Sequence, residues 1–150
     1  MKSRLALSVL LVAAASCADF PRDPEGTLDR VRTERSFRVG LVAPLDRTNL
    51  DARAAALLKR VGRAVGAKPK IESGDAEPLL NRLEEGELDL VIGRFEKKSP
   101  WKRLVSFGPP LRIEMHKKTT FHLTAAARNG ENAWIALVEA EARNVGASEG

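Results

Sequence analysis

The regular alternation of strand-like and helix-like segments in the middle of the chain is the strongest constraint on its fold. Residues 37–43 ("FRVGLVA") and 88–93 ("LDLVIG") are mostly apolar runs with one charged residue each, which is typical of strands buried on both faces. Between them lie an amphipathic helical segment at 49–66, a short strand at 68–73 and a second helical segment at 74–87. This order predicts an α/β fold with a single open, mainly parallel sheet flanked by helices.

Polar residues and glycines mark the predicted ends of these helices. Asn49 is placed to cap the first helix and Gly66 to end it, while Asp75 and Gly86 hold the same positions in the second. Before the first strand, Thr27 is placed to cap a short helix. The remaining predicted segments are a strand at 103–107, a connector rich in Pro and Lys at 108–119, a strand at 120–127 and a helix at 130–145.

The first residues have the layout of an export signal. Lys2 and Arg4 precede an apolar run that is too short to span a bilayer, and small residues follow it. We interpret 1–16 as a signal peptide of the lipoprotein type, with Cys17 as the lipidated residue. The alternative to lipidation is ordinary signal-peptide cleavage after Ala15, which would leave Cys17 as an incidental free thiol. The expected domains are an extended tether at 17–26, a single α/β lobe at 27–145 and a flexible tail at 146–150.

Composition and charge limit the classes of partner. Aromatic residues make up 5% of the chain and tyrosine is absent, so stacking platforms for single-stranded nucleic acid are poorly supplied. Export also argues against nucleic acid as a partner. The formal net charge falls from +5 to +3 when Lys2 and Arg4 are removed. This balance is compatible with attraction to anionic lipid headgroups or to an acidic partner.

Four stretches together resemble a known family. They are "GTLDRVRTERSFRVGLVAP" (26–44), "LLNRLEEGELDLVIG" (79–93), "SPWKRLVSFGPPL" (99–111) and "HLTAAARNGENAWIALVEAEARN" (122–144). In this order they resemble the first lobe of the family 3 extracellular solute-binding proteins, which are the receptors of amino-acid-type ABC importers and have the type II periplasmic-binding fold. In that family a whole second lobe lies between the last two stretches, where this chain has a short connector. The resemblance therefore implies a single lobe, without the second lobe that would form the other side of a ligand-binding cleft.

The candidate ligand-binding residues follow from a rule for open parallel sheets, whose ligands lie beyond the carboxyl ends of the strands. This rule selects Pro44, Asp46, Arg47, Gly74, Asp75, Gly93, Arg94 and Phe95. The resemblance implies an arginine that clamps a carboxylate after the third strand, but the equivalent position is Trp101. Arg103 or Arg94 would have to replace that arginine. The resemblance also implies acidic residues near the start of the helix that follows the first strand, but the equivalent positions here are Ala54 and Ala56.

The basic segment 94–103 also has a purely structural interpretation. It can be a solvated loop in which Trp101 covers the edge of the sheet while lysines keep that edge soluble. An exposed apolar patch around Phe95, Trp101 and Phe107 would favour protein docking. A recessed polar pocket at Asp46, Arg94 and Arg103 would instead favour a solute.

Other chemistry has little support in the sequence. His116 and His122 lack further ligands at zinc spacing, and we find no phosphate-binding glycine loop and no nucleophile with a matching base. Glu84, Glu85 and Glu87 are interpreted as a solvated helix end. We therefore expect no metal, no cofactor and no catalytic residues.

The sequence thus predicts an exported, non-catalytic, solute-binding-like protein of the periplasm or cell envelope, held at a membrane by a lipid anchor. Its expected partners are a small solute, either an amino acid or a small carboxylate, and an ABC permease or a second envelope protein. The alternative is an accessory module for protein interaction in the envelope that has lost solute binding.

Overall fold

The computed structural model describes residues 22–147, which form one mixed sheet with helices on both faces. The sheet order is β2-β1-β3-β6-β4, and β5 pairs with the free part of β6 beyond β4. The strands are β1 (Ser36–Val42), β2 (Lys68–Gly74), β3 (Leu90–Glu96), β4 (Val105–Phe107), β5 (Arg112–His116) and β6 (Thr119–Arg128). Among these six strands only β6 runs opposite to the others. The predicted open α/β sheet is confirmed.

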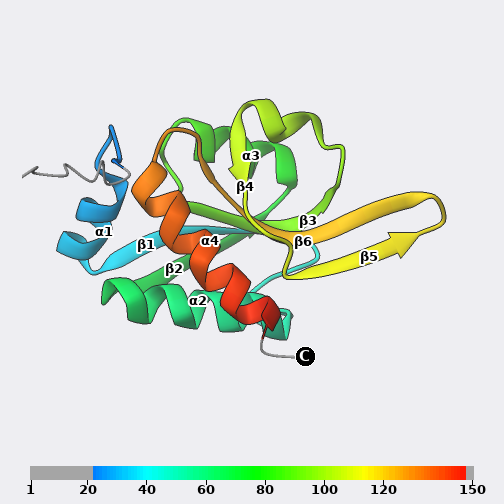
Figure 1. The fold of residues 1–150 in the computed structure, drawn as a ribbon, viewed down its shortest axis with the longest axis horizontal. Helices are drawn as coiled ribbons and strands as arrows, with labels where there is room; N and C mark the ends of the chain where they lie inside the picture. The colour runs from blue at the N-terminus through cyan, green and yellow to red at the C-terminus, as the bar shows by residue number, and fades with distance from the viewer. Residues whose placement is uncertain (1–21, 148–150) are drawn as a thin grey trace, which may run out of the picture.

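The helices form two layers, as Figure 1 shows. They are α1 (Thr27–Glu34), α2 (Ala52–Val65), α3 (Ala76–Glu84) and α4 (Asn132–Ala147), with a 3-10 turn η1 at Pro100–Arg103. The α2 and α4 helices cover one face of the sheet, whereas α3 covers the other. No helix within residues 22–147 is long and apolar enough to cross a membrane.

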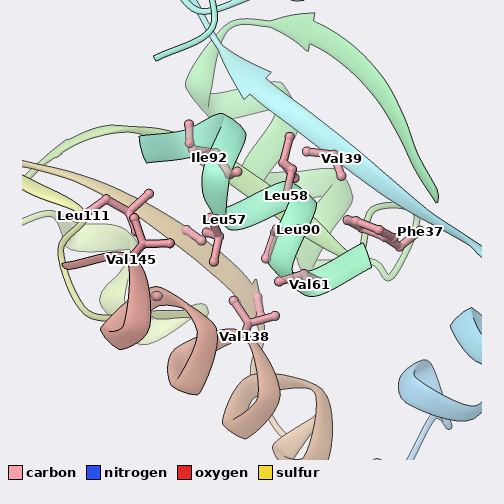
Figure 2. Close-up of a cluster of buried hydrophobic side chains, with 14 of the residues drawn as sticks. Phe37, Val39, Leu57, Leu58, Val61, Leu90, Ile92, Leu111, Val138 and Val145 are labelled. Carbon is pink, nitrogen blue, oxygen red and sulfur yellow. The ribbon is translucent and has the colours of Figure 1, made fainter. Parts of the chain in front are cut away.

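The larger core lies between the sheet, α2 and α4. Figure 2 shows Leu57, Leu58 and Val61 of α2 facing strand residues such as Leu90 and Ile92. The spacing of these α2 residues puts them on one helix face, as the apolar pattern predicts. A helix as short as α2 is only marginally stable in isolation, so most of its stability comes from burying this face.

A buried ionic cluster lies at the amino end of β3. Asp89 is 3% exposed, and its carboxylate accepts hydrogen bonds from the backbone N–H and guanidinium of Arg38 and from the guanidinium of Arg30. The indole Nε1 of Trp134 donates to the Asp89 carbonyl at 2.7 Å. These bonds tie α1, β1 and α4 to the start of β3.

Residues 22–26, just before α1, are part of the fold, which corrects the tether prediction for this part of 17–26. The carboxylate of Asp23 accepts from the N–H groups of Leu28, Ala133 and Trp134, so it bonds to the first turns of α1 and α4. Glu131 accepts from the N–H groups on either side of Gly26. Residues 22–26 therefore belong to the lobe. The predicted signal peptide, Cys17 and residues 17–21 lie outside the described residues, as do 148–150 of the predicted tail.

Two predicted helix caps are wrong, by two residues and by one residue. The N-cap of α2 is Asp51, which accepts from the N–H groups of Arg53 and Ala54, rather than Asn49. Thr27 is the first residue of α1, whose N-cap is Gly26. Gly66 does end α2, with φ at 68° in the left-handed region that glycine tolerates.

The predicted connector at 108–119 contains a strand. The chain forms β5, turns at Lys117, which has a positive φ of 54°, and returns as β6. This hairpin stands where the resemblance places a second lobe.

Candidate functional site

The carboxyl ends of the three parallel strands meet at one edge of the sheet, as predicted. The N–H of Ala43, just after β1, donates to the carbonyl of Gly74 at the end of β2 at 2.9 Å. Leu41 near the end of β1 lies opposite Ile92 of β3. The loops that leave these strands are therefore neighbours, and the residues selected by the strand-end rule lie along this edge. Arg103 does not, because it precedes β4 at the amino end of the sheet, near Asn129.

The loop after β1 uses its polar side chains to hold its own shape. The Asp46 carboxylate accepts from the N–H and hydroxyl of Thr48 and from the N–H of Asn49, at 2.6 to 2.8 Å. These bonds hold the pKa of Asp46 below its ordinary value, and the bond from the Thr48 hydroxyl contributes most to this lowering. The Arg47 guanidinium donates to the Ile71 carbonyl of β2, while Pro44 is exposed. None of these groups points to a shared pocket.

The two glycines at the edge have packing roles. A Cβ at Gly93 would lie 2.7 Å from the Val42 side chain, so β1 and β3 need the glycine to pack at this point. Gly74 lies beneath Leu79 of α3. Asp75 is the N-cap of α3, and its exposed side chain makes no capping hydrogen bond.

Arg94 points to the α2 face of the sheet and has partners there. Its Nε donates to Glu114 at 2.6 Å, and its guanidinium lies 4.6 Å from the centre of the Phe121 ring. Glu114 also binds Arg112, which reaches Asp51 at the start of α2. An ionic network therefore fills this side of the edge, and Arg94 is not a free clamp.

A cavity of about 450 Å³ lies on the opposite face, at the ends of β3, β4 and β6. Phe95 and Phe107 form its apolar part, with their ring centres 4.9 Å apart. Polar groups and two lysines surround them. The polar and charged lining residues are Glu96, Lys97, Lys102, Ser106, His122, Thr124 and Asn129. We call this cavity the β3–β6 pocket.

The β3–β6 pocket has an electropositive side. Partial burial, together with the positive charges of Lys97 and Lys102, lowers the pKa of His122. The imidazole is therefore neutral at pH 7, and the lysines remain the cations that face the pocket. Two ammonium groups beside apolar rings can bind a small molecule that has a carboxylate and an apolar part.

The segment before β4 closes the β3–β6 pocket from one side. Ser99 accepts from the N–H of Trp101 at the start of η1, and the half-buried Trp101 packs on the core beneath α3. Arg103 is exposed, while its carbonyl accepts from Asn129. Trp101 therefore packs on this core and does not line the β3–β6 pocket. The two sets of residues proposed to distinguish docking from solute binding form neither an exposed apolar patch nor a recessed polar pocket.

Of the ten predicted site residues, only Phe95 lines the β3–β6 pocket. The sequence analysis missed Lys97, Lys102, His122 and Thr124. The basic run "EKKSPWKR" was the one available signal, but strand pairing across β6 decides which of its side chains face His122 and Thr124. Within residues 22–147 no group of three or more His, Cys, Asp or Glu side chains is placed to hold a metal ion.

Comparisons with known proteins agree on the fold. No protein-family profile and no curated protein matches the sequence. Among solved structures, the arginine-bound domain 1 of TmArgBP matches with a TM-score of 0.65 at 18% identity, over 77% of this chain and 98% of that one. Holo ArgBP from T. maritima gives 0.64 at 12% identity, over 81% and 95%. An ancestral cationic amino acid solute-binding protein gives 0.63 at 12%, over 79% and 93%.

These matches define the class of the fold. The chain has the fold of one domain of a periplasmic-binding protein, and its structural neighbours are amino-acid-binding proteins. The described residues thus have the fold of one such domain.

Proposed function

We propose that the chain is an exported, non-catalytic solute-binding protein of the cell envelope, formed by one lobe and related to the substrate-binding components of amino-acid-type ABC importers. The observation that carries this proposal is the match to an isolated domain 1 that is itself arginine-bound, over nearly the whole of that domain. The export signal and Cys17 support attachment to a membrane through a lipid anchor. An ABC permease or a second envelope protein is the proposed partner.

The β3–β6 pocket is the proposed solute site. Lys97 and Lys102 would bind a carboxylate, and the rings of Phe95 and Phe107 would contact an apolar part of the solute. The solute class is therefore a small carboxylate or an amino acid with an apolar side chain. Glu96, which also lines the pocket, is the available partner for an α-amino group.

Binding by a single lobe is expected to be weak. Hinge closure of two lobes usually buries the solute on both sides, and the described lobe has no such facing wall. The arginine-bound domain 1 of TmArgBP is a single domain, which supports solute binding without a second lobe in this fold. We expect dissociation constants weaker than about 1 μM and no large closure on binding.

A thermal-shift screen tests this function. Amino acids, small carboxylates and polyamines are added to the chain from residue 18 onward, which keeps every residue of the described fold. A ligand that binds only the folded state raises the melting temperature. We expect a shift with a carboxylate-bearing compound, loss of that shift in Lys102→Gln, and an unchanged shift in Lys59→Gln, which alters an exposed lysine on α2.

Two results would contradict the proposal. One is the absence of a shift with every compound. The other is an equal shift in both variants, which would place the binding elsewhere. The absence of any shift would favour the alternative, an accessory module for protein interaction in the envelope. The pairing of Arg94 with Glu114, which removes the expected clamp, is the observation that favours this alternative.

A further inference from the structure

The hairpin of β5 and β6 projects from the rest of the lobe, as Figure 1 shows at the end of the sheet farthest from α1. We call residues 112–123 of this hairpin the arm. Its base is fixed by the ionic network of Arg94, Glu114, Arg112 and Asp51 on the α2 face. The other face of the arm has no covering element among the described residues.

Two large apolar side chains lie on this uncovered face. Ile113 is 62% exposed and Met115 is 79% exposed, the two highest values among the large hydrophobic residues described. Ile113 lies opposite His122 in the register, so it shares a face with the mouth of the β3–β6 pocket. Exposed apolar residues that are gathered on one projecting element indicate an interaction surface.

Four lysines surround the same part of the arm. The turn after β3 contributes Lys97 and Lys98, and the tip of the hairpin contributes Lys117 and Lys118. The two segments are joined by a hydrogen bond from the Lys97 N–H to the Thr120 carbonyl, at 2.9 Å. None of these four lysines forms an ion pair with another described residue. We call them the lysine cluster.

A small pocket of about 210 Å³ lies within the lysine cluster. Lys97, Lys98 and Lys118 line it together with Thr119 and Thr120. Ammonium groups and hydroxyls are donors that suit a phosphate group. Glu96 also lines this pocket, so its local charge is reduced but stays positive.

We propose that the arm docks on a membrane surface that contains anionic phospholipids. The lysine cluster would bind the phosphate groups, and Ile113 and Met115 would insert among the acyl chains. Lysines near an anionic surface and apolar side chains at the headgroup boundary are the two contributions that make peripheral membrane binding strong. This inference does not depend on solute binding.

The arrangement fits a lipid surface better than a polypeptide. A specific protein interface needs a well-packed complementary patch of roughly 800 Å² on each side. The arm offers only two apolar side chains and a group of exposed lysine side chains. A bilayer requires no shape complementarity, since headgroups rearrange around whatever projects into them. The projection of the arm beyond the helices lets its tip reach a flat surface first.

Vesicle cosedimentation tests the proposal. The chain from residue 18 is mixed with vesicles of phosphatidylcholine alone or of phosphatidylcholine with phosphatidylglycerol. We expect binding only to the anionic vesicles and a decrease as salt is raised. Lys117→Gln with Lys118→Gln should weaken binding by about 30-fold, from the typical contribution of a lysine near an anionic surface. Ile113→Ser with Met115→Ser should weaken it by at least about tenfold.

A charge-matched control separates the arm from net charge. Lys59→Gln with Arg63→Gln removes two exposed cations from α2, on the other face of the sheet. Its effect should stay within about threefold; an effect equal to that of the arm variant would overturn the proposal. Binding that persists in the Ile113 and Met115 variant, together with equal binding to poly-glutamate, would also overturn it, in favour of an acidic polypeptide. Full competition by millimolar glycerol phosphate would assign the small pocket to a free phosphate compound instead.

Discussion

Replacing Asp89 with asparagine is expected to lower the free energy of unfolding by about 3 kcal/mol. One carboxylate oxygen accepts from the guanidinium groups of Arg30 and Arg38, and the other accepts from the N–H and Nε of Arg38. The asparagine amide keeps one acceptor, but it presents an NH₂ donor where a guanidinium now donates. About two charge-assisted hydrogen bonds are lost, and each contributes roughly 1.5–3 kcal/mol.

The solvent exposure of the two arginines reduces the energy lost with these two hydrogen bonds. The Arg30 and Arg38 side chains are 28% and 36% exposed, so both can regain water when the carboxylate is removed. The estimate of about 3 kcal/mol is therefore at the lower end of the cost of breaking a buried ion pair.

Urea unfolding followed by circular dichroism measures the change. The midpoint should fall while the slope with denaturant stays the same, because the variant exposes the same surface on unfolding. Glu84→Gln, an exposed residue in the last turn of α3, is the control and should stay within about 0.5 kcal/mol of the parent. A loss below about 1 kcal/mol for Asp89→Asn at constant slope would refute the role assigned to this cluster.

Three further predictions concern the stability of the lobe. Burial raises the pKa of Glu131, but the Thr27 side chain and the N–H groups of Glu25 and Thr27 together bring this pKa below its ordinary value. The stabilising contribution of Glu131 is therefore lost as pH falls through the lowered pKa. Urea midpoints from pH 7 to 3 should fall less steeply for Glu131→Gln below about pH 4.3, and parallel curves would contradict this. Gly93→Ala should cost about 1–3 kcal/mol because its Cβ would meet Val42, and an unchanged melting temperature would show that the strands shift freely. A chain that starts at Thr27 lacks the Asp23 carboxylate and should be less stable than one from residue 18 by at least about 1 kcal/mol; equal stability would argue against its capping role.

The order of elements was predictable because each element has a strong local pattern. The apolar run that ends at Gly93 and the one-sided apolar face of α2 need no knowledge of the tertiary structure. Cap positions were less predictable, since Asn49 and Asp51 are both good N-cap residues two positions apart.

The hairpin and the pocket were not predictable from local pattern. β5 ("RIEMH") does alternate polar and apolar residues, but it has only five residues, it lies between a Pro-rich and a Lys-rich stretch, and its apolar face is exposed instead of packing on the core. The β3–β6 pocket depends on which residues of β6 lie opposite Phe95, and this register is set by pairing between segments about 27 positions apart. The rule for strand ends identified residues at the carboxyl edge of the sheet, but it did not give the face on which each side chain lies.

The hairpin tip also has a consequence for where the chain tolerates an insertion. β5 and β6 pair from Arg112 with Leu123 to His116 with Thr119, so the chain leaves and returns at neighbouring points. An insertion between Lys117 and Lys118 would meet a two-stranded stem already in place and would leave every core contact unchanged. This exposed turn is therefore the point at which the lobe can accept an additional segment with the least change to its core.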